Sequence, residues 1–239
     1  MSAEFTISKD NLDMYLKELA KEFRRLNGTK TPAEIILIGG AAVIANYGFR
    51  EMTNDIDALI FASSVMKEAI NRISDRHGLP NGWLNADFKK TKSFSEKLIG
   101  ISKYYKTFSN ILTIRTIAAE YLIAMKLMSG REYKYDLSDI AGILLEHDKK
   151  GEPITWDDID KAMAELYGGW KDVPANSIEY LSDVFADDDY AKTYRDARER
   201  EIGGREAVLE FDKESPGKLK GDMIEEIIKR AREKEKAGE

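Results

Sequence analysis

The segment from Ile35 to Ile60 constrains the fold of this chain more than any other part of the sequence. It opens with four consecutive apolar residues, Ile35 to Ile38, which is typical of a strand buried on both faces. Gly39-Gly40 ends that strand, and the small residues from Ala41 to Tyr47 predict a short helix. A second strand is predicted over Asp55–Ile60, because polar and apolar residues alternate there. Strands that alternate with helices indicate an α/β fold.

Two carboxylates stand at the start of the second strand. Asp55 and Asp57 are separated by one residue, so they lie on the same face of a strand while Ile56 points into the core. Such a pair can hold one divalent cation or two adjacent ones. Gly39 and Gly40 leave backbone N–H groups bare at a helix N-terminus, which is a natural seat for phosphate. Together these parts suit a nucleoside triphosphate bridged by metal to the paired aspartates, and in-line attack at phosphorus.

The composition narrows the choice of metal. The chain has 239 residues, no cysteine and only two histidines, His77 and His147, both expected to be ordinary residues at helix C-termini. Thiolate zinc sites, disulfides and a cysteine nucleophile are therefore excluded. A site built from carboxylates favours Mg²⁺ or Mn²⁺. The net charge of −6 does not suggest a strongly basic nucleic-acid binder, although a local basic groove is compatible with it.

The order of these residues resembles the DNA polymerase beta-like nucleotidyltransferase superfamily. Its mark is an apolar strand, a Gly-Gly or Gly-Ser turn, a short helix and then an Asp-x-Asp or Asp-x-Glu strand, which here are Gly39, Gly40, Asp55 and Asp57. Within it, the segment looks closest to the branch of AbiEii-type toxins and related uncharacterised nucleotidyltransferases. That branch has an Arg-x-x-Thr-x-Asp-Ile-Asp variant, and the resemblance therefore implies nucleotide-binding roles for Arg50 and Thr53.

A second block carries the same resemblance. The motif consists of an apolar helix with a single lysine, followed by an arginine and then by Asp-x-x-Asp-Ile. The corresponding residues here are Lys126, Arg131, Asp136, Asp139 and Ile140. An apolar helix that spares one lysine suggests that Lys126 contacts phosphate, and Arg131 could contact the charge of the nucleotide. The general base is left unassigned, and Asp136 or Asp139 could take that role if their helix faces the site. The superfamily usually has a third carboxylate on a later strand, predicted here over Trp83–Phe88. Asp87 is the candidate, and it matches that position poorly.

Each of these residues also has a structural interpretation that stays open at this point. The two strand aspartates could form a solvated strand end, the glycines a turn without a ligand, and Lys126 a helix-edge lysine that extends to water. Asp136 and Asp139 could instead stabilise a helix N-terminus. The remaining residues in question could simply pack the loop or form an ion pair, namely Arg50, Thr53 and Arg131.

The rest of the chain sets the predicted domain organisation. Helical periodicity is predicted over Ser8–Leu26, Ser63–His77, Ile117–Ser129 and Asp136–His147. From about Gly151 the character becomes wholly helical, so we expect a nucleotidyltransferase domain over residues 1–150 and a helical C-terminal region over 151–239. The N-terminal residues lack the apolar run of a signal peptide, and we expect a cytoplasmic protein.

The predicted function is metal-dependent transfer of a nucleotide from a nucleoside triphosphate to an acceptor. By resemblance the acceptor is tRNA or another RNA, and the biological role is that of a toxin with a cognate antitoxin protein. Phe88 to Phe108 interleaves aromatic residues with six lysines, a pattern of RNA surfaces and equally of a solvated lysine face over core aromatics. The alternatives are nucleotidylation of a small molecule or protein, and a non-catalytic binding module on the same fold.

Overall fold

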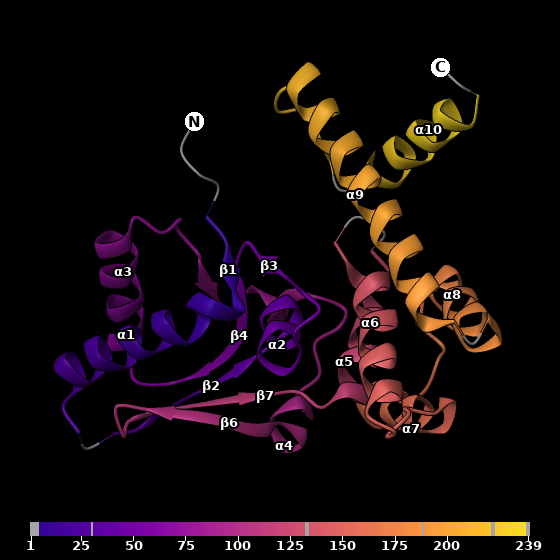
Figure 1. The fold of residues 1–239 in the computed structure, drawn as a ribbon. Coiled ribbons are helices and arrows are strands. Elements are labelled where there is room, and N and C mark those ends of the chain that lie inside the picture. The colour runs from indigo at the N-terminus through magenta and orange to yellow at the C-terminus, as the bar shows by residue number, and fades with distance from the viewer. Residues whose placement is uncertain (1–4, 30, 132–133, 188, 221–222, 238–239) are drawn as a thin grey trace. The chain divides into compact units, whose positions relative to one another are not determined.

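The computed structural model describes residues 5–29, 31–131, 134–187, 189–220 and 223–237. Contacts group the chain into two compact units, the first made of Met1–Met125 with Ile154–Lys171 and the second of Lys126–Pro153 with Asp172–Glu239. The chain leaves the first unit within a helix, after Met125, and returns to it from Ile154 to Lys171. Figure 1 shows the order of the helices and strands. In the described part of the chain, no helix is long and apolar enough to cross a membrane.

A mixed five-stranded sheet forms the centre of the first unit. Its strand order is β5-β4-β2-β7-β6, with β2 parallel to β7 and antiparallel to β4. The central strand β2 contains Ile35, Ile36 and Leu37, which are completely buried, as the apolar run predicts. The predicted α/β fold is thereby confirmed. The strands of this sheet are β2 (Ala33–Leu37), β4 (Ile56–Phe61), β5 (Leu84–Asn85), β6 (Lys103–Phe108) and β7 (Leu112–Thr116).

Helices flank the sheet, and a short pair of strands, β1 (Ile7–Ser8) and β3 (Met52–Thr53), forms beside it. The first helix follows Ser8, whose backbone N–H donates to Asn11 Oδ1 at 2.8 Å. It ends at Gly28, where φ is +71°. The helices of this unit are α1 (Lys9–Asn27), α2 (Gly39–Asn46), α3 (Val65–His77), α4 (Leu98–Ile101) and α7 (Trp156–Tyr167), with the 3-10 turn η1 (Asp87–Lys90).

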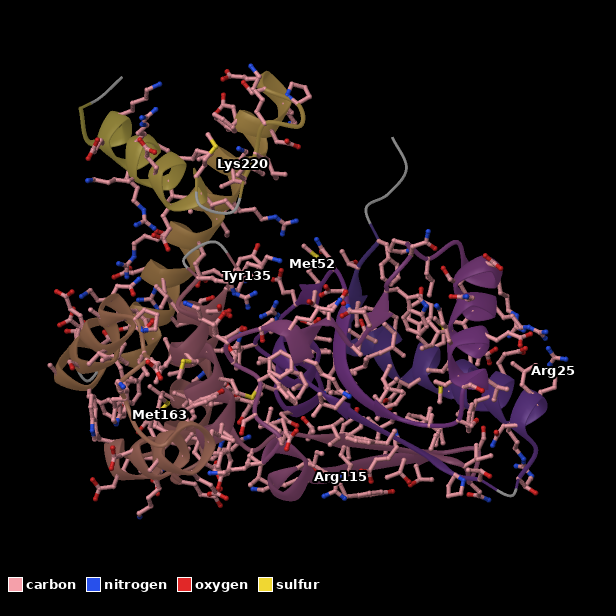
Figure 2. The ribbon with its side chains drawn as sticks, turned by 180° about the vertical axis from the view of Figure 1, so that it is seen from behind. Arg25, Met52, Arg115, Tyr135, Met163 and Lys220 are labelled. Atoms are coloured by element: carbon pink, nitrogen blue, oxygen red, sulfur yellow. The ribbon has the colours of Figure 1, made fainter. Side chains whose placement is uncertain are left out.

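A buried carboxylate ties α1 to α3. Glu22 is only 3% exposed and accepts from three arginines: Arg25 Nη2 at 2.5 Å, Arg76 Nη2 at 2.9 Å and Arg72 Nη1 at 3.3 Å. Arg25 is labelled near the end of α1 in Figure 2. The hydrogen bond from Arg25 is the main reason that the pKa of Glu22 falls to about 2, against the opposing effect of burial.

The second unit is helical, and the helical C-terminal region is confirmed. Helix α5 (Ala119–Ser129) crosses from the first unit into the second, which also contains α6 (Asp136–Lys149) and α8 (Ala175–Asp187). Two further helices complete it, α9 (Tyr190–Glu214) and α10 (Ile224–Ala237). Helix α9 packs on α6 and α10, and Gly204 of α9 lies against Ile228 of α10.

Two local predictions differ from the structure. The predicted strand Trp83–Phe88 is a strand only at Leu84–Asn85, because Asp87 opens a 3-10 turn whose first amide donates to Asn85 Oδ1 at 2.9 Å. The stretch from Lys103 to Phe108 forms the edge strand β6, which the sequence pattern did not indicate. The two lysines of this strand, Lys103 and Lys106, are exposed, and exposed lysines on an edge strand protect it from pairing with another chain.

Candidate functional site

The Gly39-Gly40 turn joins the central strand to α2. Gly39 has a φ of +55°, a left-handed conformation that favours glycine, and it is the first residue of α2. The first amides of a helix have no carbonyl partner within that helix, and Ile38 at the N-cap position has no side-chain acceptor to offer them. The sequence therefore places bare N–H groups and the positive end of a helix dipole at the end of β2.

Arg50 and Thr53 lie directly against Gly40. A Cβ atom added to Gly40 would be 2.7 Å from Arg50 Nη2 and 2.8 Å from Thr53 Oγ1, so no larger residue fits without displacement. Both side chains are buried, with Arg50 7% and Thr53 8% exposed, and Arg50 Nε donates to the Met52 carbonyl at 3.2 Å. The structure thus gathers a guanidinium group, a hydroxyl group and the α2 N-terminus at one turn.

The two strand aspartates adjoin that turn. Ile56 is fully buried while Asp55 and Asp57 on either side of it are half-buried, as the predicted alternation requires. Strand β4 begins at Ile56, so Asp57 lies on the strand and Asp55 directly precedes it. The backbone N–H of Ile38 donates to the Asp57 carbonyl at 2.9 Å, which fixes the turn to β4. A Cβ on Gly39 would lie 3.8 Å from Asp57 Oδ2, so this carboxylate faces the glycine turn.

Asn85, and not Asp87, occupies the sheet position beside Asp57. Strand β5 runs parallel to β4 with Asn85 in register with Asp57. Asp87 lies on η1, where its side chain is 71% exposed and pairs with Lys90 at 2.6 Å. The position where the resemblance implies a third carboxylate therefore has an amide next to the aspartate pair.

Among the described residues, no group of three or more histidine, cysteine, aspartate or glutamate side chains is arranged to hold a metal ion. Magnesium commonly uses one or two protein carboxylates and takes its other ligands from water and substrate phosphates. The oxygens of Asp55 and Asp57 fit that pattern. The histidines do not contribute to this site: the His77 ring packs edge-on against Tyr15 at 5.6 Å, and His147 Nδ1 lies 3.2 Å from the Glu152 carbonyl.

The residues of the second sequence block form an ionic cluster within the second unit, in which all but Arg131, whose side chain is 43% exposed, are buried. Lys126 Nζ lies 3.0 Å from Asp136 Oδ1 and 2.6 Å from Asp139 Oδ2, and Arg131 Nε lies 3.0 Å from Asp136 Oδ2. Lys126 is 5% exposed, and each aspartate is 1% exposed. Two cations and two carboxylates thus balance each other, and Lys126 does not extend along a helix edge into water.

The ionisation of this cluster follows from its partners. Burial by itself would raise the pKa of Asp136, but the charges of Lys126 and Arg131 hold that pKa below its usual value. Asp136 is therefore a carboxylate at neutral pH. Asp136 and Asp139 both lie in the first turn of α6, where the helix dipole also favours negative charge.

Glu201 of α9 is a polar residue of this region that the sequence pattern did not reveal. It is 1% exposed and accepts from the Leu137 and Ser138 amides at 2.8 and 3.3 Å and from Ser138 Oγ at 2.5 Å. Burial raises the pKa of Glu201 to about 7. The hydrogen bond from Ser138 lowers that pKa, and the charge of Asp139 adds to the increase. It is one of many charged residues in α9, so only the fold distinguishes it.

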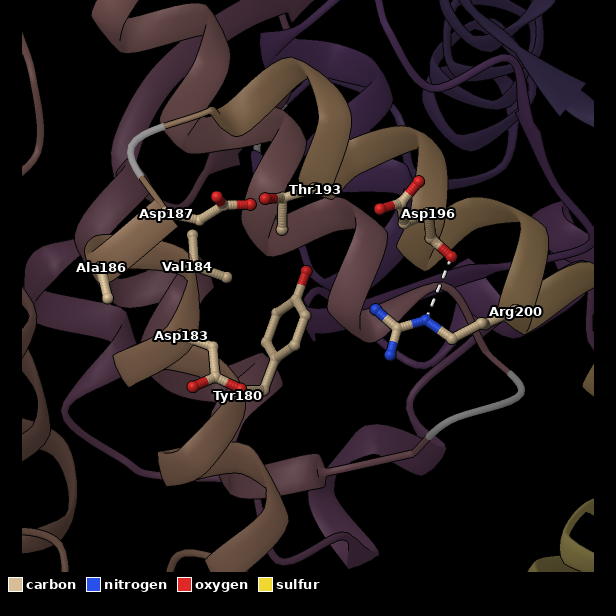
Figure 3. Close-up of a pocket in the computed structure, with 8 residues that line it drawn as sticks. All are labelled: Tyr180, Asp183, Val184, Ala186, Asp187, Thr193, Asp196 and Arg200. Carbon is tan, nitrogen blue, oxygen red and sulfur yellow. Dashed lines mark hydrogen bonds between the residues drawn. The ribbon is translucent and has the colours of Figure 1, made fainter.

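A pocket of about 450 Å³ lies between α8 and α9 in the second unit. Figure 3 shows the hydroxyl of Tyr180 and the guanidinium of Arg200 extending into it, among three aspartates. Arg200 Nε donates to the Asp196 carbonyl at 3.1 Å, and the hydroxyl of Tyr180 donates to the Leu137 carbonyl at 2.9 Å. A smaller neighbouring cavity of about 170 Å³ shares Tyr180 and Arg200 and is also lined by Glu201.

Comparison with known proteins places the chain in a family. No curated protein and no solved structure was found to match it. A protein family described as a nucleotidyltransferase of unknown function, DUF6036, matches residues 14–167, which is more than half of the chain. The matched segment contains the glycine turn, the aspartate pair and the cluster around Lys126, whereas α8, α9 and α10 lie beyond it. The chain belongs to this nucleotidyltransferase family.

Proposed function

We propose that this protein transfers a nucleotide from a nucleoside triphosphate to an acceptor, with Mg²⁺ or Mn²⁺ held by Asp55 and Asp57. The observation that carries the proposal is that the Asp57 carboxylate lies next to the Gly39-Gly40 turn. The carboxylate faces Gly39, and the turn is fixed to β4 through the bond from Ile38 to the Asp57 carbonyl. A nucleotidyltransferase family matches the same segment, which supports transferase chemistry.

The glycine turn is the proposed seat of the phosphates. The N-terminal amides of α2 and the Arg50 guanidinium beside Gly40 attract negative charge from the same side of the turn. The Thr53 hydroxyl also lies against Gly40 and adds a polar group at the same turn. When bound, the divalent cation would neutralise the phosphate oxygens and lower the pKa of the attacking group.

The cluster in the second unit contains the remaining residues for which we propose catalytic or nucleotide-binding roles, namely Lys126, Arg131, Asp136 and Asp139. Asp136 is a carboxylate at neutral pH, and a carboxylate can accept the proton of an acceptor hydroxyl. Lys126 and Arg131 supply positive charge, which we propose contacts the phosphates or the charge of the nucleotide. In the structure both cations pair with aspartates, so we propose that substrate phosphate competes for cations that are already ordered by those pairs.

RNA is the proposed acceptor, with a role as the toxin of a toxin–antitoxin pair and an antitoxin protein as its partner. The branch resemblance to AbiEii-type toxins supports that role. On the molecule itself, all six lysines between Phe88 and Phe108 are exposed, and Tyr104 is 64% exposed. The phenylalanines of this stretch are packed: Phe88 and Phe108 are buried, and the Phe94 ring packs edge-on against the Phe88 ring, with 6.2 Å between the ring centres. The surface therefore offers charge and one aromatic ring.

The test is a transfer assay on the full chain with each of four labelled nucleoside triphosphates. Bulk tRNA, bulk protein and a panel of small hydroxyl compounds serve as acceptors, with Mg²⁺, Mn²⁺ or a chelator. The proposal predicts label on RNA with either metal and none with the chelator. Label on protein or on a small molecule alone would refute RNA as the acceptor but would still support nucleotidyl transfer. No label on any acceptor would refute the enzyme and favour a binding module.

A further inference from the structure

Glu201 supplies hydrogen-bond acceptors that α6 cannot provide for itself. The first amides of a helix need acceptors from outside, usually a Ser, Thr, Asp or Asn at the N-cap. That position in α6 is Tyr135, which has a φ of +61° and no side-chain capping bond. The carboxyl group of Glu201 accepts from the amides of Leu137 and Ser138 instead. Glu201 lies on α9, which begins 54 residues after the start of α6.

A second contact fixes α9 to the same turn. The guanidinium carbon of Arg198 lies 3.9 Å from the centre of the Tyr135 ring, a close cation–π contact. Tyr135 is labelled at the start of α6 in Figure 2. Arg198 and Glu201 are three residues apart, so both project from one face of α9 onto the first turn of α6. Helix α9 thus holds this turn through the carboxyl group of Glu201, which accepts hydrogen bonds, and through the stacked guanidinium of Arg198.

The turn held by Glu201 is also the one that holds Lys126. Leu137 and Ser138, whose amides bond to Glu201, lie between Asp136 and Asp139, whose carboxylates pair with the Lys126 ammonium. Four consecutive residues therefore connect the two interactions. We propose that Glu201 is a positioning residue, which orders the first turn of α6 so that Asp136 and Asp139 hold the Lys126 ammonium group in place for nucleotidyl transfer.

The first amides of α6 depend on Glu201 for their hydrogen-bond acceptor. Without an acceptor, the buried amide of Ser138 and the partly buried amide of Leu137 would be unsatisfied, and the first turn would unwind to reach water. Unwinding displaces both aspartates, and small displacements of reacting groups have large effects on rate. The family match ends at residue 167, so α9 adds this support from outside the matched segment.

The test compares three variants of the full chain: Glu201→Gln, Glu201→Leu and, as a control on the exposed face of α9, Glu206→Leu. Glutamine keeps an oxygen that accepts from both amides and an NH₂ group that donates to Ser138 Oγ, whereas leucine keeps neither. The first readout is the ¹⁵N–¹H NMR signal of the Lys126 ammonium, assigned with Lys126→Arg. The second is hydrogen exchange of the Leu137 and Ser138 amides, and the third is the transfer rate.

The proposal predicts that Glu201→Leu loses the protected Lys126 signal, speeds exchange of the two amides and lowers kcat more than about tenfold with little change in KM. Glu201→Gln and Glu206→Leu keep all three properties near those of the wild type. An unchanged Lys126 signal in a folded Glu201→Leu protein would overturn the proposal, as would a Glu201→Gln variant as impaired as the leucine variant.

Ser138→Ala provides a milder change should Glu201→Leu not fold. It removes only the hydroxyl bond to Glu201, and faster exchange of the Ser138 amide together with a broadened Lys126 signal is expected. Exchange and signal identical to the wild type would again contradict the positioning role. The inference rests on the proposed function for its catalytic part, and the two can fail separately. A wild type without transfer refutes the function, while the NMR and exchange results still decide whether Glu201 orders the cluster.

Discussion

A Cβ atom on Gly40 would lie 2.7 Å from Nη2 of Arg50, closer than carbon and nitrogen approach without displacement. The glycine is needed here for space, because a buried guanidinium packs against the backbone at the start of α2. Gly39, one residue earlier, is needed for its backbone, because its φ is +55°. The turn therefore requires glycine at both positions, at position 40 for lack of space and at position 39 for the backbone conformation.

Replacing Gly40 with alanine should displace Arg50 and Thr53 and weaken both stability and transfer. We expect a loss of about 1–3 kcal/mol in the free energy of unfolding, since the added methyl group overpacks a buried site. The transfer rate should fall more than about tenfold, because the phosphate seat moves. Gly48→Ala is the control, because a Cβ on Gly48 meets no atom within 4 Å. Equal behaviour of the two variants would show that Arg50 does not constrain the turn.

Replacing Lys126 with methionine should destabilise the protein strongly. The change leaves Asp139 buried without its 2.6 Å partner, and breaking a buried pair costs about 3–5 kcal/mol. Lys149→Met in α6 is the control, since Lys149 is 59% exposed and its ion pair should contribute no more than about 1 kcal/mol. Chemical denaturation measures both. Adding Asp139→Asn to Lys126→Met should recover part of the loss, and no recovery would contradict direct pairing.

Glu22→Gln should lower stability at neutral pH and lose that effect in acid. The folded pKa of Glu22 is about 2 and its ordinary value is 4.5. A lowered folded pKa contributes stability above pH 4.5 that disappears as pH falls towards 2. The difference in Tm between wild type and variant should therefore be constant from pH 7 to 5 and close below it. A gap that is the same at pH 3 and pH 7 would exclude the ion pairs as its cause, and exposed Glu210→Gln provides the control.

Glu201→Gln should show the opposite dependence on pH. The folded pKa of Glu201 is raised from 4.5 to about 7, so wild type carries stability below pH 4.5 that it loses as pH rises to about 7. Glutamine cannot ionise, so the Tm of the variant relative to wild type should increase over that window and stay level above it. Wild type and variant have the same charged residues around the adjoining cavity. These residues are Glu179, Asp183, Arg200 and Arg232. A relative Tm that does not vary between pH 5 and 8 would contradict the raised pKa.

Local patterns were sufficient to predict the part of the fold that carries the glycine turn. The apolar run of β2, the glycine break and the alternation through Ile56 each depend on neighbouring residues only, and the structure has all three. The residues from Leu84 to Asp87 show the limit of such patterns. The side chain of Asn85 accepts from the Asp87 amide and turns the chain, which ends the strand after two residues.

Interactions between distant segments were not predictable in the same way. The pattern of lysines and tyrosines in β6 did not indicate that Tyr105 and Lys106 pair with Asp13 at 3.0 and 2.6 Å, some 92 residues away. Similarly, the spacing of Asp136 and Asp139 placed them on one helix face. It did not show that Lys126 lies between them or that Glu201 caps their turn, because both depend on how helices pack.

The transfer rate of Asp57→Asn tests the central claim most directly. Asparagine keeps the shape of the side chain and its register on β4 but removes the charge that a divalent cation requires. The matched control is Asp75→Asn, an exposed aspartate on α3. With the triphosphate and acceptor identified in the transfer assay, and with equal Tm confirming folding, we predict that Asp57→Asn loses at least about a hundredfold in rate while Asp75→Asn matches the wild type. A wild-type rate in folded Asp57→Asn would contradict the assignment of Asp55 and Asp57 as the metal-binding pair.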